Sequence, residues 1–191
     1  TRAHKTRTKS MNAFSSIDYP DVALIRDGRI LHYILQGKPP MPPVFHDKLD
    51  ANVFVLRLIP GMNPDVLRPL ANRFDALVIE SFGVGGLPCY EQADFLSAAS
   101  AWSSAGKPIV ITTQVPHEGS DLAVYQVGAR VAAQPGILQA YTMTAEAVVT
   151  KLMWILPQTR DLAQIKRLFY TPIACDLLLF EEHGQHTDES N

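Results

Sequence analysis

The sequence predicts a three-layer α/β/α domain with a parallel sheet of about four strands, and three observations lead to this fold class. From residue 52 onward, short apolar runs alternate with segments whose apolar residues recur at helical spacing. The runs are nearly continuous, as in strands buried on both faces of a parallel sheet. The chain of 191 residues is 47% apolar, which is enough for a sizeable core. Alternating strands and helices form right-handed crossovers, which place helices on both faces of such a sheet.

The first part of the chain does not follow this alternation. Apolar stretches at 22–25 and 30–35 flank Asp27-Gly28, a turn sequence that predicts a β-hairpin. Four prolines lie between residues 37 and 43, and they predict a semi-rigid spacer because proline fixes φ and lacks a backbone donor. We therefore expect four regions: 1–38 as a segment with a hairpin, 39–51 as a linker, 52–175 as the α/β domain and 176–191 as a polar tail.

The domain is expected to contain four strands and five helices. The strands are predicted at 53–59, 76–81, 108–113 and 137–141. The helices are predicted at 64–73, 90–104, 123–133, 144–156 and 159–169. Asn63 is the expected N-cap of the first helix, with Pro64 at its first position, and Gly106 is expected to end the second. Thr144 and Thr159 are the expected caps of the last two helices.

Composition argues against several classes of protein. The 17 basic and 19 acidic residues give a net charge of -2, whereas nucleic-acid binding requires a basic surface. No apolar run reaches the ~18 residues that cross a bilayer. Cys89 and Cys175 lie far apart, which favours a reducing cytoplasm over a disulfide framework. Because the chain begins with Thr1 and not Met, we interpret it as a fragment or a processed product.

Two loops at the predicted carboxyl edge of the sheet are candidate sites. The glycine-rich turn at 81–86 follows a strand, but it lacks the G-x-G-x-x-G spacing of dinucleotide sites, and no P-loop is present. It predicts a tight turn at the edge where ligands and partner subunits meet. The loop at 112–121 carries two threonines, His117, Glu118 and Asp121. These residues do not meet the ligand count of a zinc site, so a polar loop without chemistry remains the alternative.

The stretch 142–152 is the most distinctive part of the sequence. It reads Thr-Met-Thr-Ala-Glu-Ala-Val-Val-Thr-Lys-Leu. Thr144 can cap the helix, and Glu146 in the first turn suits the positive end of the helix dipole. Val148 and Leu152 would then face the core. A cap and a core face account for the stretch without chemistry.

Five motifs resemble the C-terminal domain of L-asparaginases, most closely the type I, cytoplasmic branch. In chain order they are Ile59-Pro60-Gly61-Met62, the Leu-Val-Ile-Glu-Ser-Phe-Gly-Val-Gly run at 77–85, Thr113-Gln114, Tyr125-x-x-Gly128 and the Met-Thr-x-Glu-Ala-x-x-Thr-Lys-Leu run at 143–152. The resemblance covers residues 53–170 in the right order and spacing. The D subunit of the archaeal glutamyl-tRNA amidotransferase shares this domain and is an alternative.

The first 20 residues resemble the end of the catalytic N-terminal domain of that family. On this match Lys5 corresponds to the catalytic lysine, which joins a Thr and an Asp in a triad beside a separate threonine nucleophile. The family's Thr-Gly-Gly-Thr-Ile and Thr-Asp-Thr motifs are absent and belong upstream of Thr1. The resemblance therefore implies that the complete protein hydrolyses L-asparagine to L-aspartate and ammonia without metal or cofactor. It also implies that the isolated chain is inactive.

For the chain itself, the resemblance implies a structural and interface-forming role. Substrate or interface contacts are expected from Ser81, Gly83, Gly85, Gly86, Thr113 and Gln114. Gly86 stands where the family often has Asn, and Glu80 where cytoplasmic members bind regulatory asparagine through an Arg. The expected partners are further copies, in a homodimer or homotetramer, and the missing N-terminal domain, with no nucleic acid and no membrane. A non-catalytic ligand-binding or oligomerisation module remains a second alternative.

Overall fold

A four-stranded parallel sheet forms the centre of the domain. The computed structural model describes residues 2–35, 37, 42–90, 93–124 and 136–178. The strands are β5 (Val53–Arg57), β6 (Ala76–Ser81), β9 (Ile109–Thr113) and β10 (Ile137–Gln139). Their order is β10-β9-β6-β5, so β6 and β9 are central. The predicted parallel sheet of about four strands is confirmed.

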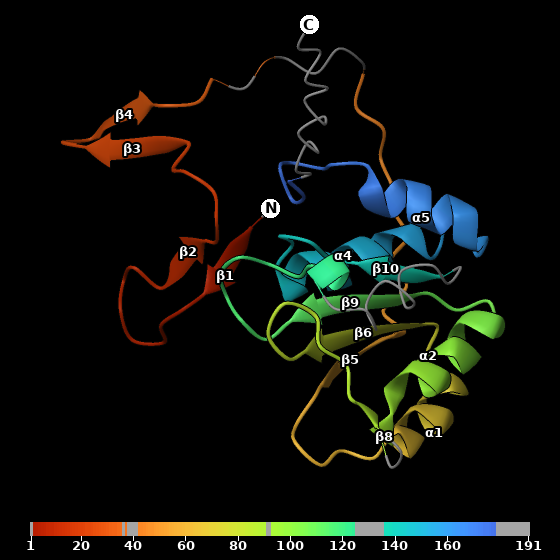
Figure 1. Cartoon of the computed structure of the whole chain (residues 1–191). Coiled ribbons are helices and arrows are strands. Elements are labelled where there is room, and N and C mark those ends of the chain that lie inside the picture. Colours follow the sequence, from red (N-terminus) through yellow and green to blue (C-terminus); the bar gives the residue numbers. More distant parts are fainter. Residues whose placement is uncertain (1, 36, 38–41, 91–92, 125–135, 179–191) are drawn as a thin grey trace, which may run out of the picture.

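Helices cover both faces of this sheet (Figure 1). On one face lie α1 (Leu67–Ala71), which follows the 3₁₀ turn η1 (Pro64–Val66), and α2 (Phe95–Ser104). On the other face lie α4 (Ala145–Ile155) and α5 (Leu162–Tyr170). The expected three-layer arrangement is therefore confirmed. Among the described residues, no helix combines the length and apolar character of a membrane span.

The side chains of β6 alternate between two apolar cores, because successive residues of a strand point to opposite faces of a sheet. Leu77 and Ile79 share one buried cluster with Trp102 of α2. Val78 belongs to the other cluster, together with Phe169 of α5. Each fully buried side chain of this size stabilises the fold by about 1.5–3 kcal/mol. Apolar burial on both faces therefore holds the layers together.

The second helix starts later than the sequence predicts. It begins at Phe95 and not at residue 90, because the Asp94 carboxylate accepts a hydrogen bond from the backbone N–H of Ser97 at 2.9 Å and caps the helix there. The preceding residues form a short antiparallel pair of β7 (Cys89–Tyr90) and β8 (Ala93–Asp94).

The last helix is also capped by an aspartate where a threonine is predicted. The Asp161 carboxylate accepts a hydrogen bond from the backbone N–H of Gln164 at 2.8 Å, so the prediction of Thr159 as the N-cap is wrong. The helix predicted at 123–133 lies largely outside the described residues. Its described start, Leu122–Val124, is the 3₁₀ turn η2.

The N-terminal segment forms two small antiparallel pairs beside the domain (Figure 1). β1 (Ala3–Lys5) pairs with β2 (Phe14–Ser16), and β3 (Ala23–Arg26) pairs with β4 (Arg29–His32). The second pair is the predicted hairpin, and φ is +51° at Asp27 and +72° at Gly28, as a type I′ turn requires. The large apolar side chains that stay exposed on or beside this hairpin are Val22, Ile25, Ile30, Leu31, Tyr33 and Leu35.

After α5 the chain packs back onto α4. Asp176 is only 4% exposed, and its carboxylate lies 2.8 Å from Nζ of Lys151 on α4. The same ammonium donates a hydrogen bond to the carbonyl oxygen of Thr171 at 2.7 Å. The first residues of the predicted polar tail, 176–178, therefore contact the domain. Residues 179–191 lie outside the described part of the chain.

Candidate functional site

A pocket lies at the carboxyl end of β9, where the N-terminal segment meets the domain. Its walls come from the N-terminal segment, from the end of β9 with the loop that follows, and from the start of α4. The lining residues are His4, Ile17, Asp18, 112–116, Gly119 and 142–145. Threonine hydroxyls, an amide, an imidazole and a carboxylate thus surround one space. The carboxyl edge of a parallel sheet is where α/β proteins usually bind ligands.

Two histidine–carboxylate pairs join the N-terminal segment to the domain at this pocket. Nδ1 of His4 lies 2.8 Å from Oε1 of Glu146, and Nδ1 of His117 lies 3.1 Å from Oδ1 of Asp18. The backbone N–H of Glu118 donates to the other oxygen of Asp18 at 3.0 Å. Exposed pairs of this kind contribute about 0–1 kcal/mol each, so they orient the segment more than they stabilise the fold. Within the described ranges, no three His, Cys, Asp or Glu side chains gather as a metal site.

The backbone around the pocket adopts left-handed conformations at non-glycine residues. The φ angles are +50° at Asp18, +73° at Glu118 and +51° at Tyr141. Gly119 has a φ of +71°, and a Cβ there would collide with the backbone carbonyl of Tyr141. A non-glycine residue in this conformation costs roughly 1–3 kcal/mol and is often found at functional sites. Three of the six described non-glycine residues with positive φ thus lie in or next to the pocket.

Arg2 is buried between the N-terminal segment and the domain, with only 3% of its surface exposed. Its Nε donates to the carbonyl oxygen of Ile17 at 2.6 Å, and Nη1 donates to the hydroxyl of Thr142 at 2.9 Å. Burial lowers the pKa of Arg2, while the nearby carboxylates of Asp18 and Asp176 act in the opposite direction. Its Nη2 is the one buried side-chain nitrogen or oxygen in the described part of the chain without a hydrogen-bond partner. The guanidinium therefore anchors the segment at a considerable desolvation cost.

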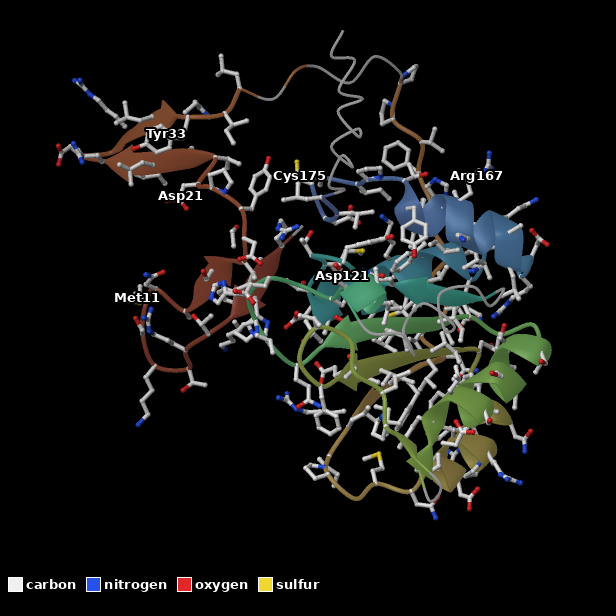
Figure 2. The ribbon with its side chains drawn as sticks, viewed as in Figure 1. Met11, Asp21, Tyr33, Asp121, Arg167 and Cys175 are labelled. Atoms are coloured by element: carbon white, nitrogen blue, oxygen red, sulfur yellow. The ribbon has the colours of Figure 1, made fainter. Side chains whose placement is uncertain are left out.

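A further contact links the segment to the chain beyond α5. The Tyr19 hydroxyl donates a hydrogen bond to Sγ of the exposed Cys175 at 3.2 Å, and this bond raises the pKa of Tyr19. Figure 2 shows Cys175 on the side of the domain that faces the segment, whereas Met11 stands at the outer tip of the β1–β2 loop. The described contact between Tyr19 and Cys175 therefore lies on the side of the domain that faces the segment.

Lys5, the lysine that the resemblance selects, lies next to the pocket but is not part of its lining. It is exposed on β1, directly opposite Phe14 of β2, and its Nζ lies 5.9 Å from the centroid of that ring. Side chains alternate along a strand, so Lys5 points to the face opposite His4. Its ammonium is accordingly turned away from the pocket.

Among the six loop residues predicted as contacts, only Thr113 and Gln114 line the pocket. The Gln114 amide donates to the carbonyl oxygens of Leu58 at 2.6 Å and Glu80 at 3.0 Å. The Thr113 hydroxyl donates to the carbonyl of Gly83, and the Ser81 hydroxyl donates to the carbonyl of Thr112. These side chains tie the ends of neighbouring strands together and so hold the rim of the pocket in place.

The glycines of the predicted tight turn lie outside the pocket lining. The backbone N–H groups of Gly85 and Gly86 both donate to the carbonyl oxygen of Phe82, at 3.1 and 2.7 Å. Gly85 has a φ of +134°, which L side chains rarely adopt, and a Cβ there would lie 2.8 Å from Cδ2 of Leu122, so glycine is favoured where this turn meets the next loop. The turn is confirmed as tight. Gly86 borders a separate hollow that also includes Pro60.

Polar residues of the stretch 142–152 hold distant parts of the chain. Thr144 caps α4 by accepting a hydrogen bond from the N–H of Ala147, as predicted. Thr142 and Glu146 bind the N-terminal segment, and Lys151 binds the chain beyond α5. Sequence reasoning missed these three contacts. Only Lys151 carried a detectable sign: it lies three residues after Val148 and four before Ile155, on the core-facing stripe of the helix, where a buried charge needs a partner.

Comparison with known proteins identifies relatives of this arrangement. The family of glutaminase/asparaginase C-terminal domains matches residues 52–169. An L-asparaginase from Thermococcus kodakarensis is 41% identical over 180 residues, which cover 93% of this chain and 53% of that protein. The D subunit of glutamyl-tRNA(Gln) amidotransferase from the same organism is 28% identical over 183 residues, which cover 93% of this chain and 40% of that protein.

A solved structure is similar over nearly the same extent. The thermostable L-asparaginase from Thermococcus kodakarensis superposes with a TM-score of 0.87 at 38% identity, covering 94% of this chain and 54% of that one. The chain thus spans about half the length of the L-asparaginase relative that it matches.

Proposed function

Because the chain belongs to the family of glutaminase/asparaginase C-terminal domains, we propose that it is the C-terminal part of an L-asparaginase. One observation carries this proposal. Proteins named L-asparaginase match more than nine tenths of the chain, so the likeness extends well beyond the family domain at 52–169. The proposed reaction is hydrolysis of the L-asparagine side-chain amide to L-aspartate and ammonia.

The proposed chemistry needs groups that lie upstream of this chain. A base removes the threonine proton, and the threonine oxygen attacks the amide carbon. The C–N bond breaks as the leaving nitrogen takes up that proton and departs as ammonia. Water then hydrolyses the resulting ester to release aspartate and the free hydroxyl. Threonine is a poor nucleophile unless a neighbouring base removes its proton. In the proposal, Lys5 belongs to the triad that performs this activation. The exposed position of Lys5 on β1, turned away from the domain, supports a role toward a group outside the chain.

The proposed role of residues 52–178 is to hold Lys5 in place, to shape the rim of the active site and to form subunit interfaces. Ser81, Gly83, Gly85, Gly86, Thr113 and Gln114 are the proposed contact residues. The exposed apolar side chains of the β3–β4 hairpin support a covered surface in the complete protein. We further propose a homodimer or homotetramer in the cytoplasm.

Two alternatives remain distinct from this proposal. The identity to the amidotransferase D subunit supports a role in tRNA amidation, which would require a partner protein for activity. An isolated module that binds a ligand or oligomerises without catalysis is the other alternative. Ammonia release from free asparagine by the complete polypeptide, without a second protein, separates the L-asparaginase from both.

The test measures ammonia from L-asparagine with the 191-residue chain alone and with the upstream half supplied as the intact gene product. We expect release only from the intact product. Lys5→Met should lower its kcat at least about a hundredfold, since removing a group that activates the nucleophile costs at least that much. Lys9→Met, an exposed lysine in the same segment, is the matched control and should leave kcat unchanged. Hydrolysis by the 191 residues alone would refute the proposal.

A further inference from the structure

We infer that Thr142 and Glu146 are positioning residues for Lys5, acting through Arg2 and His4. This inference rests on the proposed function, because it assigns Lys5 a place in the reaction. The two anchors lie on the domain, and the two residues that they hold lie on β1 beside the lysine or directly before that strand.

The alternation of side chains on β1 is the first step of the argument. Arg2 and His4 are two residues apart and both contact the domain, at Thr142 and at Glu146. Lys5 follows His4 and therefore points to the opposite face of the strand. Contacts on one face thus determine where the ammonium on the other face is presented.

The β1–β2 pair has little of its own to hold it in place. Each strand has three residues, and the Phe14 side chain that could supply packing is exposed. An isolated two-stranded pair is marginally stable in water. Apart from the buried Ile17 directly after β2, the position of Lys5 therefore depends on the polar contacts with the domain.

Thr142 is the buried anchor. Its hydroxyl accepts hydrogen bonds from Nη1 of Arg2 at 2.9 Å and from the backbone N–H of Leu178 at 3.2 Å. The Arg2 side chain also spans to the carbonyl of Ile17, which links β1 to the chain just after β2. Loss of the Thr142 hydroxyl would leave a second guanidinium nitrogen without a partner in a buried site.

Glu146 is the anchor on the helix. It lies in the first turn of α4, where the helix dipole favours a carboxylate, and Thr144 caps the same turn. The Thr150 hydroxyl donates to the carbonyl oxygen of Glu146 at 2.8 Å and closes the turn from the other side. Because α4 packs on the core of the domain, the backbone of Glu146 is held in place, and its carboxylate lies within hydrogen-bond distance of His4.

The catalytic test uses two matched pairs of variants in the intact gene product. Thr142→Val keeps the shape but removes the hydroxyl, and Thr142→Ser keeps the hydroxyl. Glu146→Ala removes the acceptor for His4 on an exposed helix face, and Glu146→Gln keeps an oxygen that accepts the same hydrogen bond. We expect Thr142→Val and Glu146→Ala to lower kcat about tenfold or more, with KM changed less than about twofold. Misplacing a catalytic group by about 1 Å can lower the rate about a hundredfold.

Rescue is the readout that a merely structural role would not give. Thr142→Ser and Glu146→Gln should stay within about twofold of the wild-type kcat, while Asp47→Ala, which removes an exposed carboxylate from the linker, should have no effect. The inference would be overturned if Thr142→Val and Glu146→Ala both kept the wild-type kcat. It would also be overturned if Thr142→Ser and Glu146→Gln lost as much kcat as those two variants.

The structural arm needs no activity and separates the two possible failures. The backbone N–H of Ile17 donates to the carbonyl of Arg2 at 3.2 Å, so its hydrogen exchange in the 191-residue chain reports where Arg2 lies. We expect exchange about tenfold faster in Thr142→Val than in Thr142→Ser. Equal exchange rates in the two variants would show that the Thr142 hydroxyl does not hold Arg2 in place. An inactive wild-type product with the expected exchange difference would overturn the proposed function, and with it the catalytic part of this inference.

Discussion

The N-terminal segment and the α/β domain are held by different physical means. The domain buries Leu77, Ile79 and Phe169 completely between its layers. The segment instead exposes most of its large apolar side chains, with Ile17 as a buried exception, and it attaches mainly through Arg2, His4 and a few other polar groups. Side-chain packing keeps a domain folded, whereas oriented polar contacts place a short segment without stabilising it much. The difference shows that contacts with the domain determine the position of the segment, which has little packing of its own.

The largest expected effect tests the apolar half of this comparison. Leu77→Ala in β6 should lower the free energy of unfolding by about 2–5 kcal/mol, because removing the buried leucine side chain leaves a cavity. Ile30→Ala on the β3–β4 hairpin, where the side chain is 59% exposed, should change it by less than about 0.5 kcal/mol. Urea unfolding of the 191-residue chain measures both. A comparable loss for Ile30→Ala would show that the hairpin contributes to the core after all.

Two glycines sharpen the comparison with an intermediate effect. Gly119→Ala should cost about 1–3 kcal/mol, because its positive φ is strained for alanine and the new Cβ meets the backbone of Tyr141, which cannot easily move. Gly28→Ala has a similar φ but open space, so only the hairpin turn should be affected. The same unfolding measurement distinguishes them. Equal losses would mean that the loop at Gly119 can relax.

The smallest expected effect is a dependence on alkaline pH. Burial raises the pKa of Tyr170 to about 12, above its ordinary value of 10.0. The folded state therefore keeps this proton longer than the unfolded state, so stability is full below pH 10 and falls between 10 and 12. The loss should reach about 1 kcal/mol near pH 11.

Substitution isolates this alkaline loss. Tyr170→Phe should flatten the decline in unfolding free energy between pH 9 and about pH 11, whereas Tyr33→Phe on the exposed hairpin should leave it unchanged. An identical decline in the wild type and in Tyr170→Phe would assign it to another group.

Most of the fold could be predicted because apolar periodicity decides it. The four strands, both helix layers and the hairpin around Gly28 follow from that periodicity and from turn residues. The start of α2 was missed because the predicted helix extends back to residue 90, over residues that form β7 and β8, although the Asp94 cap is itself a local signal. The prediction of strands buried on both faces also fails at Val55, which is exposed because β5 is the edge of the sheet.

Less of the candidate site could be predicted. The carboxyl edge and the polar loop with His117 were expected, but the partner Asp18 is about a hundred residues away, and no local pattern announces such a contact. Arg2 and Thr142 are separated still further. Contacts between charged groups of distant segments depend on the assembled fold, and the sequence shows only that each residue is polar.

The other edge of the sheet has a consequence for solubility. On β10, the backbone N–H of Gln139 donates to the Tyr170 hydroxyl at 2.9 Å, and so an outward donor of an edge strand is already occupied by a side chain. An open edge offers such donors to the strands of other molecules and seeds aggregation. The phenol of Tyr170 therefore leaves β10 one backbone donor fewer to offer to a strand of a neighbouring copy.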